Sequence, residues 1–286
     1  MNDLNFVKMS GAGNDFIVID NRDGKVAEPG RDELIAGWCC RRVGIGADGV
    51  LLVEPPEGDA DFRMRYYNAD GGEAETCGNG ARCISAFAHS VGAAPAQMRF
   101  ETMVGPYEAK IIEGGVILGM GDPHSLRRDI DLNLPGIAGS VDAIDTGVPH
   151  AVYFVADAAA IDLQDLGAKI RYHEAFAPAG VNANFAQVLD DGRIAVRTYE
   201  RGVEGETLAC GTGSIAVALV AKLRGLADKS PVRIQTTGGP VLKIHFEHAK
   251  SDSGEETFGS IKLEGEARVV YQGVIPHSAM APAFTS

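Results

Sequence analysis

The feature of this sequence that most constrains its fold is an internal duplication. Residues 63–88 and residues 195–220 share one order: a short strand-like start, a turn rich in glycine and glutamate, the motif C-G-x-G, and an apolar helix-like stretch. Downstream, R-F-E-T at 99–102 matches R-I-Q-T at 233–236. Because self-similarity at a nearly fixed offset is the mark of a repeated structural unit, the chain is predicted to form two similar domains.

Strand-like segments outnumber helix-like segments in both halves. Short β-branched or aromatic stretches bounded by Gly, Pro or Asp predict strands, and the main helices are expected at 80–89 and 213–223. The expected fold class is α+β: two pseudo-symmetric domains, each a mixed or barrel-like sheet wrapped around a central helix, with the active site in the cleft between them. The predicted halves are residues 1–122, to which residues 272–286 return, and residues 123–271.

Charge and hydropathy exclude several classes of protein. The 286 residues include 26 Lys and Arg against 39 Asp and Glu, which gives a formal net charge of −13. Nucleic acid and anionic membranes both attract a positive surface, so neither partner is expected. The N-terminus lacks the apolar core of a signal peptide, and the longest apolar run is far shorter than the ~20 residues of a spanning helix. A cytoplasmic protein that acts on a small molecule is therefore expected.

Two of the five cysteines are set apart by the duplication. No disulfide framework and no C-x-x-C pair is present, so neither a zinc ribbon nor a thioredoxin-like site is indicated. Cys77 and Cys210 each stand just before a predicted helix, where unpaired N–H groups and the helix dipole bind anions and lower the pKa of a thiol. Each half is thus predicted to offer an activated cysteine beside a carboxylate site, with no cofactor and no metal.

Two equivalent thiols indicate an inversion at carbon. If both reach one carbon from opposite faces, one as thiolate removes a proton and the other as thiol delivers a proton. Reacting distances of about 3–3.5 Å on each side place the sulfurs roughly 6–7 Å apart. Because the α-proton of an amino acid is a very weak acid, helix N-termini aimed at the carboxylate are the expected means of stabilising the charge that develops.

Three motifs resemble those of the diaminopimelate epimerase family, and the resemblance covers essentially the whole chain. They are K-M-S-G-A-G-N-D-F-I-V-I-D at 8–20, N-A-D-G-G-E-A-E-T-C-G-N-G-A-R at 68–82 and Y-E-R-G-V-E-G-E-T-L-A-C-G-T-G at 199–213. The resemblance implies an isomerase that interconverts LL- and meso-diaminopimelate in lysine and peptidoglycan-precursor synthesis, without pyridoxal phosphate. It also implies a homodimer.

The resemblance further assigns roles to individual residues. Cys77 and Cys210 would be the base and the acid. The residues expected to bind the substrate are Asn14, Asn68, Gly78, Asn79, His150, Asn182, Glu200, Arg201, Gly211 and Thr212. In that set, Gly78-Asn79 and Gly211-Thr212, which follow the two cysteines, would hold the reacting carboxylate. His150 and Glu200 would orient the reacting end. The other asparagines and the arginine would bind chiefly the distal end.

Departures from the family pattern leave the substrate open. Gly49 stands where many members have Gln, Gly72 where Ser is common, and Val148 where Asn is common. The nearest alternative is a racemase or epimerase of another amino acid on the same scaffold. Two alternatives come from other classes. A thiol redox protein would leave the duplicated anion sites unexplained, and a non-catalytic amino-acid-binding protein would not need both cysteines.

Overall fold

The chain folds into two compact units. The computed structural model describes residues 3–27, 29–75, 77–252, 254 and 256–276. Unit 1 comprises Met1–Leu118 and Gly265–Ser286, and unit 2 comprises Gly119–Glu264. The return to unit 1 begins before the residue 272 expected from the sequence, because β17 (Arg268–Ile275) pairs antiparallel with β1 (Leu4–Gly11) along its length. Residues 277–286 of the predicted return lie outside the described residues.

Unit 1 is built on a mixed sheet. Strand β2 pairs antiparallel with β1 and parallel with β3, β3 pairs antiparallel with β4, and β4 pairs parallel with β5, which continues through antiparallel β6 and β7. The remaining bounds are β2 Asn14–Asp20, α1 Arg31–Cys39, β3 Gly49–Glu54, β4 Phe62–Asn68, α2 Gly78–Ser90, β5 Gln97–Thr102, β6 Gly105–Ile112 and β7 Gly115–Gly119.

Unit 2 repeats this order of pairing. Strand β10 pairs antiparallel with β9 and parallel with β11, β11 pairs antiparallel with β12, and β12 pairs parallel with β14, which continues through β15 and β16. The bounds are β8 His124–Ile130, β9 Val141–Asp145, β10 Pro149–Phe154, α3 Leu163–Arg171, η1 Glu174–Phe176, β11 Asn182–Val188, β12 Ile194–Glu200, β13 Gly205–Thr207, α4 Gly211–Leu223, β14 Val232–Gln235, β15 Val241–Lys250 and β16 Glu256–Gly265. The duplicated α+β fold predicted from the sequence is confirmed.

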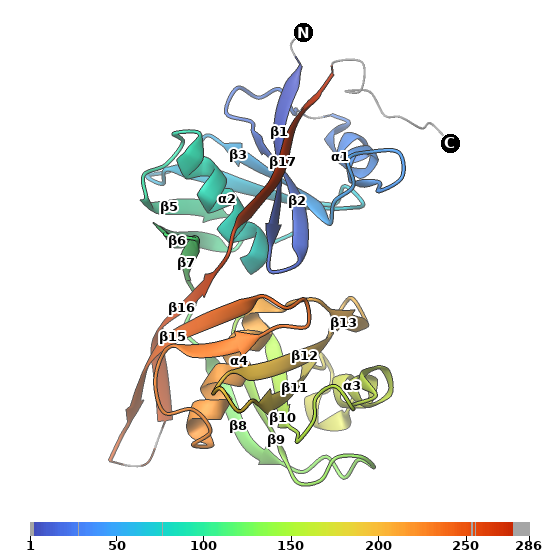
Figure 1. Ribbon diagram of the computed structural model, residues 1–286, viewed down its shortest axis with the longest axis vertical. Coiled ribbons are helices and arrows are strands. Elements are labelled where there is room, and N and C mark those ends of the chain that lie inside the picture. Colours follow the sequence, from blue (N-terminus) through green and yellow to red (C-terminus); the bar gives the residue numbers. More distant parts are fainter. Residues whose placement is uncertain (1–2, 28, 76, 253, 255, 277–286) are drawn as a thin grey trace. The chain divides into compact units, whose positions relative to one another are not determined.

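One helix lies at the centre of each unit. Helix α2 packs on β1, β2, β3 and β6, and α4 packs on β9, β10, β11 and β15 (Figure 1). Residues 213–221 of α4 are all buried, which is what a helix that is apolar on every side requires. Helix α2 is buried at 79–85 and 87–88, and it includes the fully buried Arg82. The sheet of each unit thus surrounds the helix that follows its cysteine.

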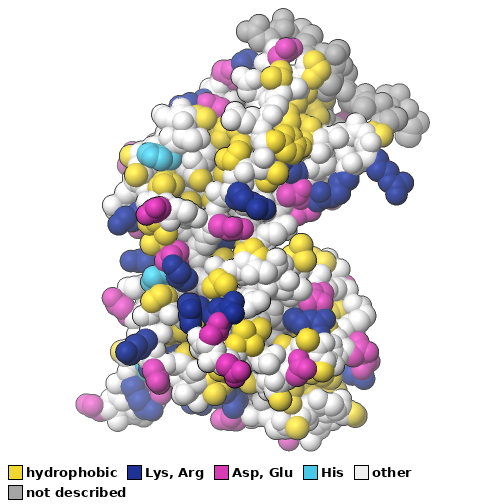
Figure 2. Space-filling model, in the orientation of Figure 1, with side chains coloured by type: hydrophobic (Ala, Val, Ile, Leu, Met, Phe, Trp, Pro, Cys, Tyr) yellow, Lys and Arg dark blue, Asp and Glu magenta, His cyan; other side chains and the backbone are white. Residues whose placement is uncertain are grey.

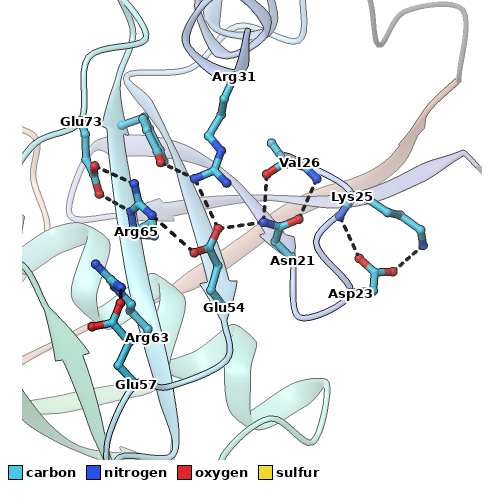
Figure 3. Close-up of polar contacts among 11 residues, drawn as sticks. Asn21, Asp23, Lys25, Val26, Arg31, Glu54, Glu57, Arg63, Arg65 and Glu73 are labelled. Atoms are coloured by element: carbon cyan, nitrogen blue, oxygen red, sulfur yellow. Dashed lines mark hydrogen bonds and ion pairs between the residues drawn. The ribbon is translucent and has the colours of Figure 1, made fainter. Parts of the chain in front are cut away.

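Polar side chains fix α1 against the sheet of unit 1. Arg31, the first residue of α1, donates to the Tyr67 hydroxyl at 2.6 Å, and its Nη1 lies 3.4 Å from Glu54 Oε1. Asn21 Nδ2 donates to the same Glu54 oxygen at 2.8 Å, and Arg65 lies 3.6 Å from the other oxygen (Figure 3). Glu54 therefore joins α1, β4 and the loop after β2 at one largely buried point.

The sequence patterns miss four strands and one α-helix. Strands β1, β8, β9 and β13 and helix α3 lack a clear prediction, and β8 shows why: its sequence H-S-L-R-R-D-I is polar and its side chains are mostly exposed. Helix α3 contains Gly167, a residue that weakens a helix. A Cβ at this position would lie 2.6 Å from Tyr199 Cβ, so close packing on β12 requires the glycine.

The surface carries mixed charge. On the face drawn in Figure 2, basic and acidic side chains lie interspersed over both units. In the described part of the chain, the helices are all too short or too polar to cross a membrane.

Candidate active site

The first cysteine turn begins α2. Cys77 caps this helix: its backbone is extended (φ −149°, ψ 114°), and the Gly80 N–H donates to its Sγ at 3.5 Å. A Cβ on Gly80 would lie 3.2 Å from Leu51 Cδ2, so the glycine lets the helix start close to β3. The sulfur lies at the positive end of the helix, where the dipole and the first N–H groups favour an anion.

The side chain of Asn79 is held from two directions. Its Nδ2 donates to Asn14 Oδ1 at 2.6 Å, and its Oδ1 accepts from Arg82 Nη2 at 2.8 Å. Arg82 also donates to the carbonyl oxygens of Gly78 at 3.2 Å and Glu266 at 3.4 Å. Burial lowers the pKa of Arg82, but these three acceptors stabilise its charged form. A buried cation therefore braces the turn that follows the first cysteine.

A network of charges orients Asn14. Asp48 Oδ2 accepts from Asn14 Nδ2 and from the Asp15 N–H, each at 3.1 Å. Arg41 lies 2.6 Å from Asp15 and 2.7 Å from Asp48, and Lys8 lies 2.7 Å from Asp15. Burial by itself would raise the pKa of Asp15, but the hydrogen bonds and charges of Arg41 and Lys8 hold it well below its usual range. The turn between β1 and β2 is thus fixed by ion pairs.

Asn68 lies at the same edge of the sheet as the start of β3. It is the last residue of β4, its side chain is exposed, and it pairs in register with Gly49. A Cβ on Gly49 would collide with the carbonyl oxygen of Tyr67. With this backbone, the packing of β3 on β4 therefore leaves no room for a side chain at position 49.

The second cysteine turn repeats the first at the start of α4. Cys210 is extended (φ −116°, ψ 112°), and the Gly213 N–H donates to its Sγ at 3.4 Å. The hydroxyl oxygen of Thr212 lies 3.5 Å from the same sulfur. Thr146 donates to the carbonyl oxygen of Thr212 at 2.9 Å and so anchors the turn. The second sulfur therefore has a main-chain donor and a hydroxyl beside it.

His150 adjoins this second turn from β10. The side chain is completely buried, and its Nε2 lies 2.9 Å from Thr212 Oγ1. Burial, assisted by the charge of Arg201, lowers the pKa of His150 to about 3. The imidazole is therefore neutral at physiological pH, and it is linked to Cys210 through one hydroxyl.

Asn182 and the end of β12 lie at the same edge. Asn182 Oδ1 accepts from the main-chain N–H of Arg201 at 2.7 Å, and its Nδ2 donates to the carbonyl oxygen of Pro149 at 3.1 Å. Glu200 ends β12; burial raises the pKa of its carboxyl, and a hydrogen bond from Thr207 at 2.8 Å partly offsets that rise. Asn182 thus sets the backbone that carries Arg201.

The predicted residues form one group in each unit. Unit 1 holds Asn14, Asn68, Cys77, Gly78 and Asn79, and unit 2 holds His150, Asn182, Glu200, Arg201, Cys210, Gly211 and Thr212. Sequence reasoning misses two neighbours of these groups, Arg82 and Asn184. The signal for the first is a charge inside an otherwise apolar helix. The signal for the second is a polar residue two positions from Asn182, on the same face of a buried strand.

Other cysteines have different surroundings. Cys39 and Cys83 are buried, and burial raises the pKa of each thiol to about 12, which makes them unreactive neutral groups. Within the described residues, no group of three or more His, Cys, Asp or Glu is arranged to hold a metal ion.

The fold is shared with solved structures of low sequence identity. A hydroxyproline epimerase from Agrobacterium vitis has a TM-score of 0.67 at 16% identity, covering 99% of this chain and 96% of its own. A phenazine biosynthesis protein of the PhzF family from Bacillus anthracis also has a TM-score of 0.67 at 16% identity, covering 96% and 99%. The fold is therefore that of a class of duplicated α+β proteins that includes amino-acid epimerases.

Sequence comparison identifies the family within this class. The model of the diaminopimelate epimerase family matches residues 6–126 and 142–262. The diaminopimelate epimerase of Aquifex aeolicus is 41% identical over 278 residues, covering 94% of this chain and 97% of the relative. That of Chlorobaculum tepidum is 42% identical over 270 residues, covering 93% and 99%. The chain belongs to the diaminopimelate epimerase family and is an isomerase.

Proposed function

We propose that this chain interconverts LL- and meso-diaminopimelate by a two-base thiol/thiolate reaction in which Cys77 and Cys210 are the acid and the base. The observation that carries the proposal is the matched pair of cysteine turns: each sulfur caps a helix and accepts the N–H of the third helical residue, at 3.5 Å and 3.4 Å. The diaminopimelate epimerases that are 41% and 42% identical to this chain support the choice of substrate.

The reaction needs one thiolate and one thiol at the start. The thiolate takes the α-proton, and the electron pair left on the carbon is delocalised into the adjacent carboxylate. The thiol on the opposite face gives its proton to that carbon and becomes the thiolate. The N–H groups that begin α2 and α4 would donate to the carboxylate as its charge grows, and one such donor is worth about 3 kcal/mol in comparable sites.

The surrounding residues would bind and orient the substrate. Glu200 would hold the reacting amino-acid end. His150, whose buried ring nitrogens contact Asn184 and Thr212, would orient that end through the Thr212 hydroxyl. Arg201 suits the distal carboxylate because a guanidinium binds a carboxylate with two parallel hydrogen bonds. Asn14, Asn68 and Asn182 supply amides that can both donate and accept, which suits the distal amino and carboxylate groups.

The proposal extends to the setting of the enzyme. Reactive thiols require a reducing compartment, so we place the enzyme in the cytoplasm, where it makes a precursor of lysine and peptidoglycan. From the family resemblance we expect a homodimer with diaminopimelate as its small-molecule partner.

A single incubation tests this function. Purified protein with dithiothreitol and LL-diaminopimelate should yield meso-diaminopimelate, as measured by chiral chromatography. Cys77→Ala and Cys210→Ala, purified in the same way, should yield none. A panel of amino acids with one amino-acid end, such as alanine, glutamate and proline, should remain unchanged. Racemisation of one of these in place of diaminopimelate would contradict the assignment of the substrate.

A further inference from the structure

The two units differ at one buried point beside their cysteine turns. Unit 2 has His150 on β10 and Asn184 on β11, with exposures of 0% and 1%; unit 1 has Phe16 on β2 and Leu51 on β3, both at 0%. Strand register makes these pairs equivalent. Phe16 pairs in register with Gly49, and Leu51 lies two residues after Gly49 on β3. His150 pairs in register with Asn182, and Asn184 lies two residues after Asn182 on β11.

This comparison indicates a role for the polar pair beyond packing. A Cβ on Gly80 would meet Leu51, and a Cβ on Gly213 would meet the Asn184 oxygen, so both residues contact the first turn of the central helix. The fold therefore accepts an apolar pair at this place. Burying an amide and an imidazole instead costs desolvation, which only their hydrogen bonds recover.

The orientation of the Asn184 amide is determined by its neighbours. Its Nδ2 lies 2.9 Å from the carbonyl oxygen of Ala151 and 3.3 Å from that of Asn182, and its Oδ1 accepts from the Thr198 hydroxyl at 2.9 Å. Exchanging the nitrogen and the oxygen would bring the amide oxygen against two carbonyl oxygens. Since carbonyl oxygens only accept, the nitrogen must face them.

The same nitrogen faces His150 Nδ1 at 3.1 Å. The amide has two protons for three acceptors: one is donated to the Ala151 carbonyl at 2.9 Å, and the other lies between His150 Nδ1 at 3.1 Å and the Asn182 carbonyl at 3.3 Å. Because an amide nitrogen only donates, Nδ1 is the accepting atom of this contact and carries no proton. The imidazole is neutral, so its single proton is on Nε2. That proton is donated to Thr212 Oγ1 at 2.9 Å.

The hydroxyl proton of Thr212 is then directed away from the histidine. A hydroxyl has one proton, and Oγ1 already accepts from the imidazole, so its proton is available to the sulfur of Cys210 at 3.5 Å. With the other tautomer, the hydroxyl would donate to Nε2 and be lost to any anion in the site. The chain of contacts therefore makes Thr212 a donor.

We propose that Asn184 is a positioning residue for the chemistry at Cys210. It holds His150 as the Nε2–H tautomer, and His150 makes the Thr212 hydroxyl a permanent donor to an anion at that turn, either the Cys210 thiolate or the carboxylate of the substrate. The catalytic consequence rests on the proposed function, but the hydrogen-bond arrangement does not depend on it.

The first experiment measures the tautomer in the unaltered protein. Nitrogen-15 histidine labelling and long-range proton–nitrogen correlation spectra distinguish Nε2–H, Nδ1–H and doubly protonated imidazoles, and a His150→Gln sample identifies the signal among the seven histidines. We expect a neutral Nε2–H imidazole throughout pH 5.5–8. An Nδ1–H tautomer, or protonation in this range, would overturn the proposal whether or not the enzyme acts on diaminopimelate.

The second experiment measures thiol reactivity. Peptide-resolved alkylation by iodoacetamide at pH 7 follows Cys210 and Cys77 in one sample. In Asn184→Leu we expect Cys210 to react about tenfold more slowly, equivalent to a rise of about one unit in its pKa, and Cys77 to react at the normal rate. The double variant His150→Phe/Asn184→Leu reproduces the pair that unit 1 packs, and it should show the same loss if the single variant does not fold.

Thr198→Val is the matched control. It removes a hydrogen bond from the opposite side of the same amide and leaves the donor to His150 anchored by the Ala151 carbonyl. We expect a similar loss of thermal stability but a Cys210 alkylation rate close to that of the unaltered protein. Equal Cys210 rates in folded Asn184→Leu, the double variant and the unaltered protein would refute the positioning role.

Discussion

The most informative stability experiment compares one substitution at two equivalent glycines, Gly80→Ala and Gly213→Ala. Both glycines are the third residue of a central helix, and both donate their N–H to a cysteine sulfur. An added Cβ at Gly80 would lie 3.2 Å from a methyl group of Leu51. An added Cβ at Gly213 would lie 2.5 Å from Asn184 Oδ1 and 3.2 Å from Cys210 Sγ.

These distances predict unequal costs. Alanine in place of glycine lowers the free energy of a helix by up to about 1 kcal/mol. At Gly80 the leucine methyl can shift by rotation of its side chain, so the gain and the strain nearly cancel. At Gly213 the amide is held by Ala151 and Thr198, so the strain should exceed the gain by about 2 kcal/mol, or about 4–8 °C in Tm.

The assay combines thermal unfolding with the rate of epimerisation. Gly80→Ala should keep its Tm within about 2 °C of the unaltered protein and most of its activity. Gly213→Ala should lower the Tm and reduce kcat at least tenfold, because relief of the clash moves the amide that faces His150. Equal effects of the two substitutions would show that the asymmetry between the turns described above has no energetic consequence.

Three further predictions concern charged groups. Arg82→Met leaves the Gly78 and Asn79 oxygens of the first cysteine turn without this donor and should destabilise the protein by about 1–3 kcal/mol. Arg63→Met loses the largely exposed partner Glu57 and should cost less than about 1 kcal/mol, and thermal unfolding of the two variants measures the contrast. Because the pKa of Asp15 is lowered in the folded state, the ionised carboxylate stabilises the fold above its ordinary pKa of about 3.9, and this stabilisation is lost as the pH falls. Asp15→Asn should therefore flatten the decline of Tm between about pH 5 and pH 3. An unchanged slope would refute this prediction. Burial raises the pKa of Glu200, so ionisation of this carboxyl opposes folding as the pH rises. The Tm of Glu200→Gln relative to the unaltered protein should therefore be higher at about pH 8 than at about pH 5, and the variant should lose epimerase activity. A difference in Tm that is the same at both pH values would count against the raised pKa of Glu200.

The sequence predicts the duplication because each copy of the motif is short and its helix start depends only on neighbouring residues. C-G-x-G before an apolar stretch predicts a helix start from neighbouring residues alone, and the structure has a cysteine-capped helix at both copies. Strand β8 escapes prediction because its side chains are polar on both faces. Position 167 escapes it because a glycine inside a helix is explained only by the ring of Tyr199, which lies far along the chain.

Residues of the candidate site divide in the same way. The cysteines and the residues that follow them are predicted from the motif, whereas Asn184 acts on the second cysteine turn through contacts that no spacing rule contains. Arg82 lies inside the first motif and contacts Gly78 and Asn79 at helical spacing, but the sequence does not show that its charge is buried. Asn184 contacts His150, 34 residues away, and the sequence offers Phe16 and Leu51 at the equivalent places as if the position were simply apolar core. The strand register shows that unit 2 has a polar pair where unit 1 has a hydrophobic one.

The most direct test of the central claim follows hydrogen at the α-carbon. The enzyme is incubated with LL-diaminopimelate in deuterium oxide, and product and remaining substrate are separated and analysed by mass spectrometry before a tenth of the substrate has reacted. Two opposed thiols predict that the meso product has one solvent deuterium at the inverted carbon while recovered LL substrate has almost none. Product that retains its original hydrogen, or substrate that exchanges as fast as product forms, would indicate a single base and contradict the account.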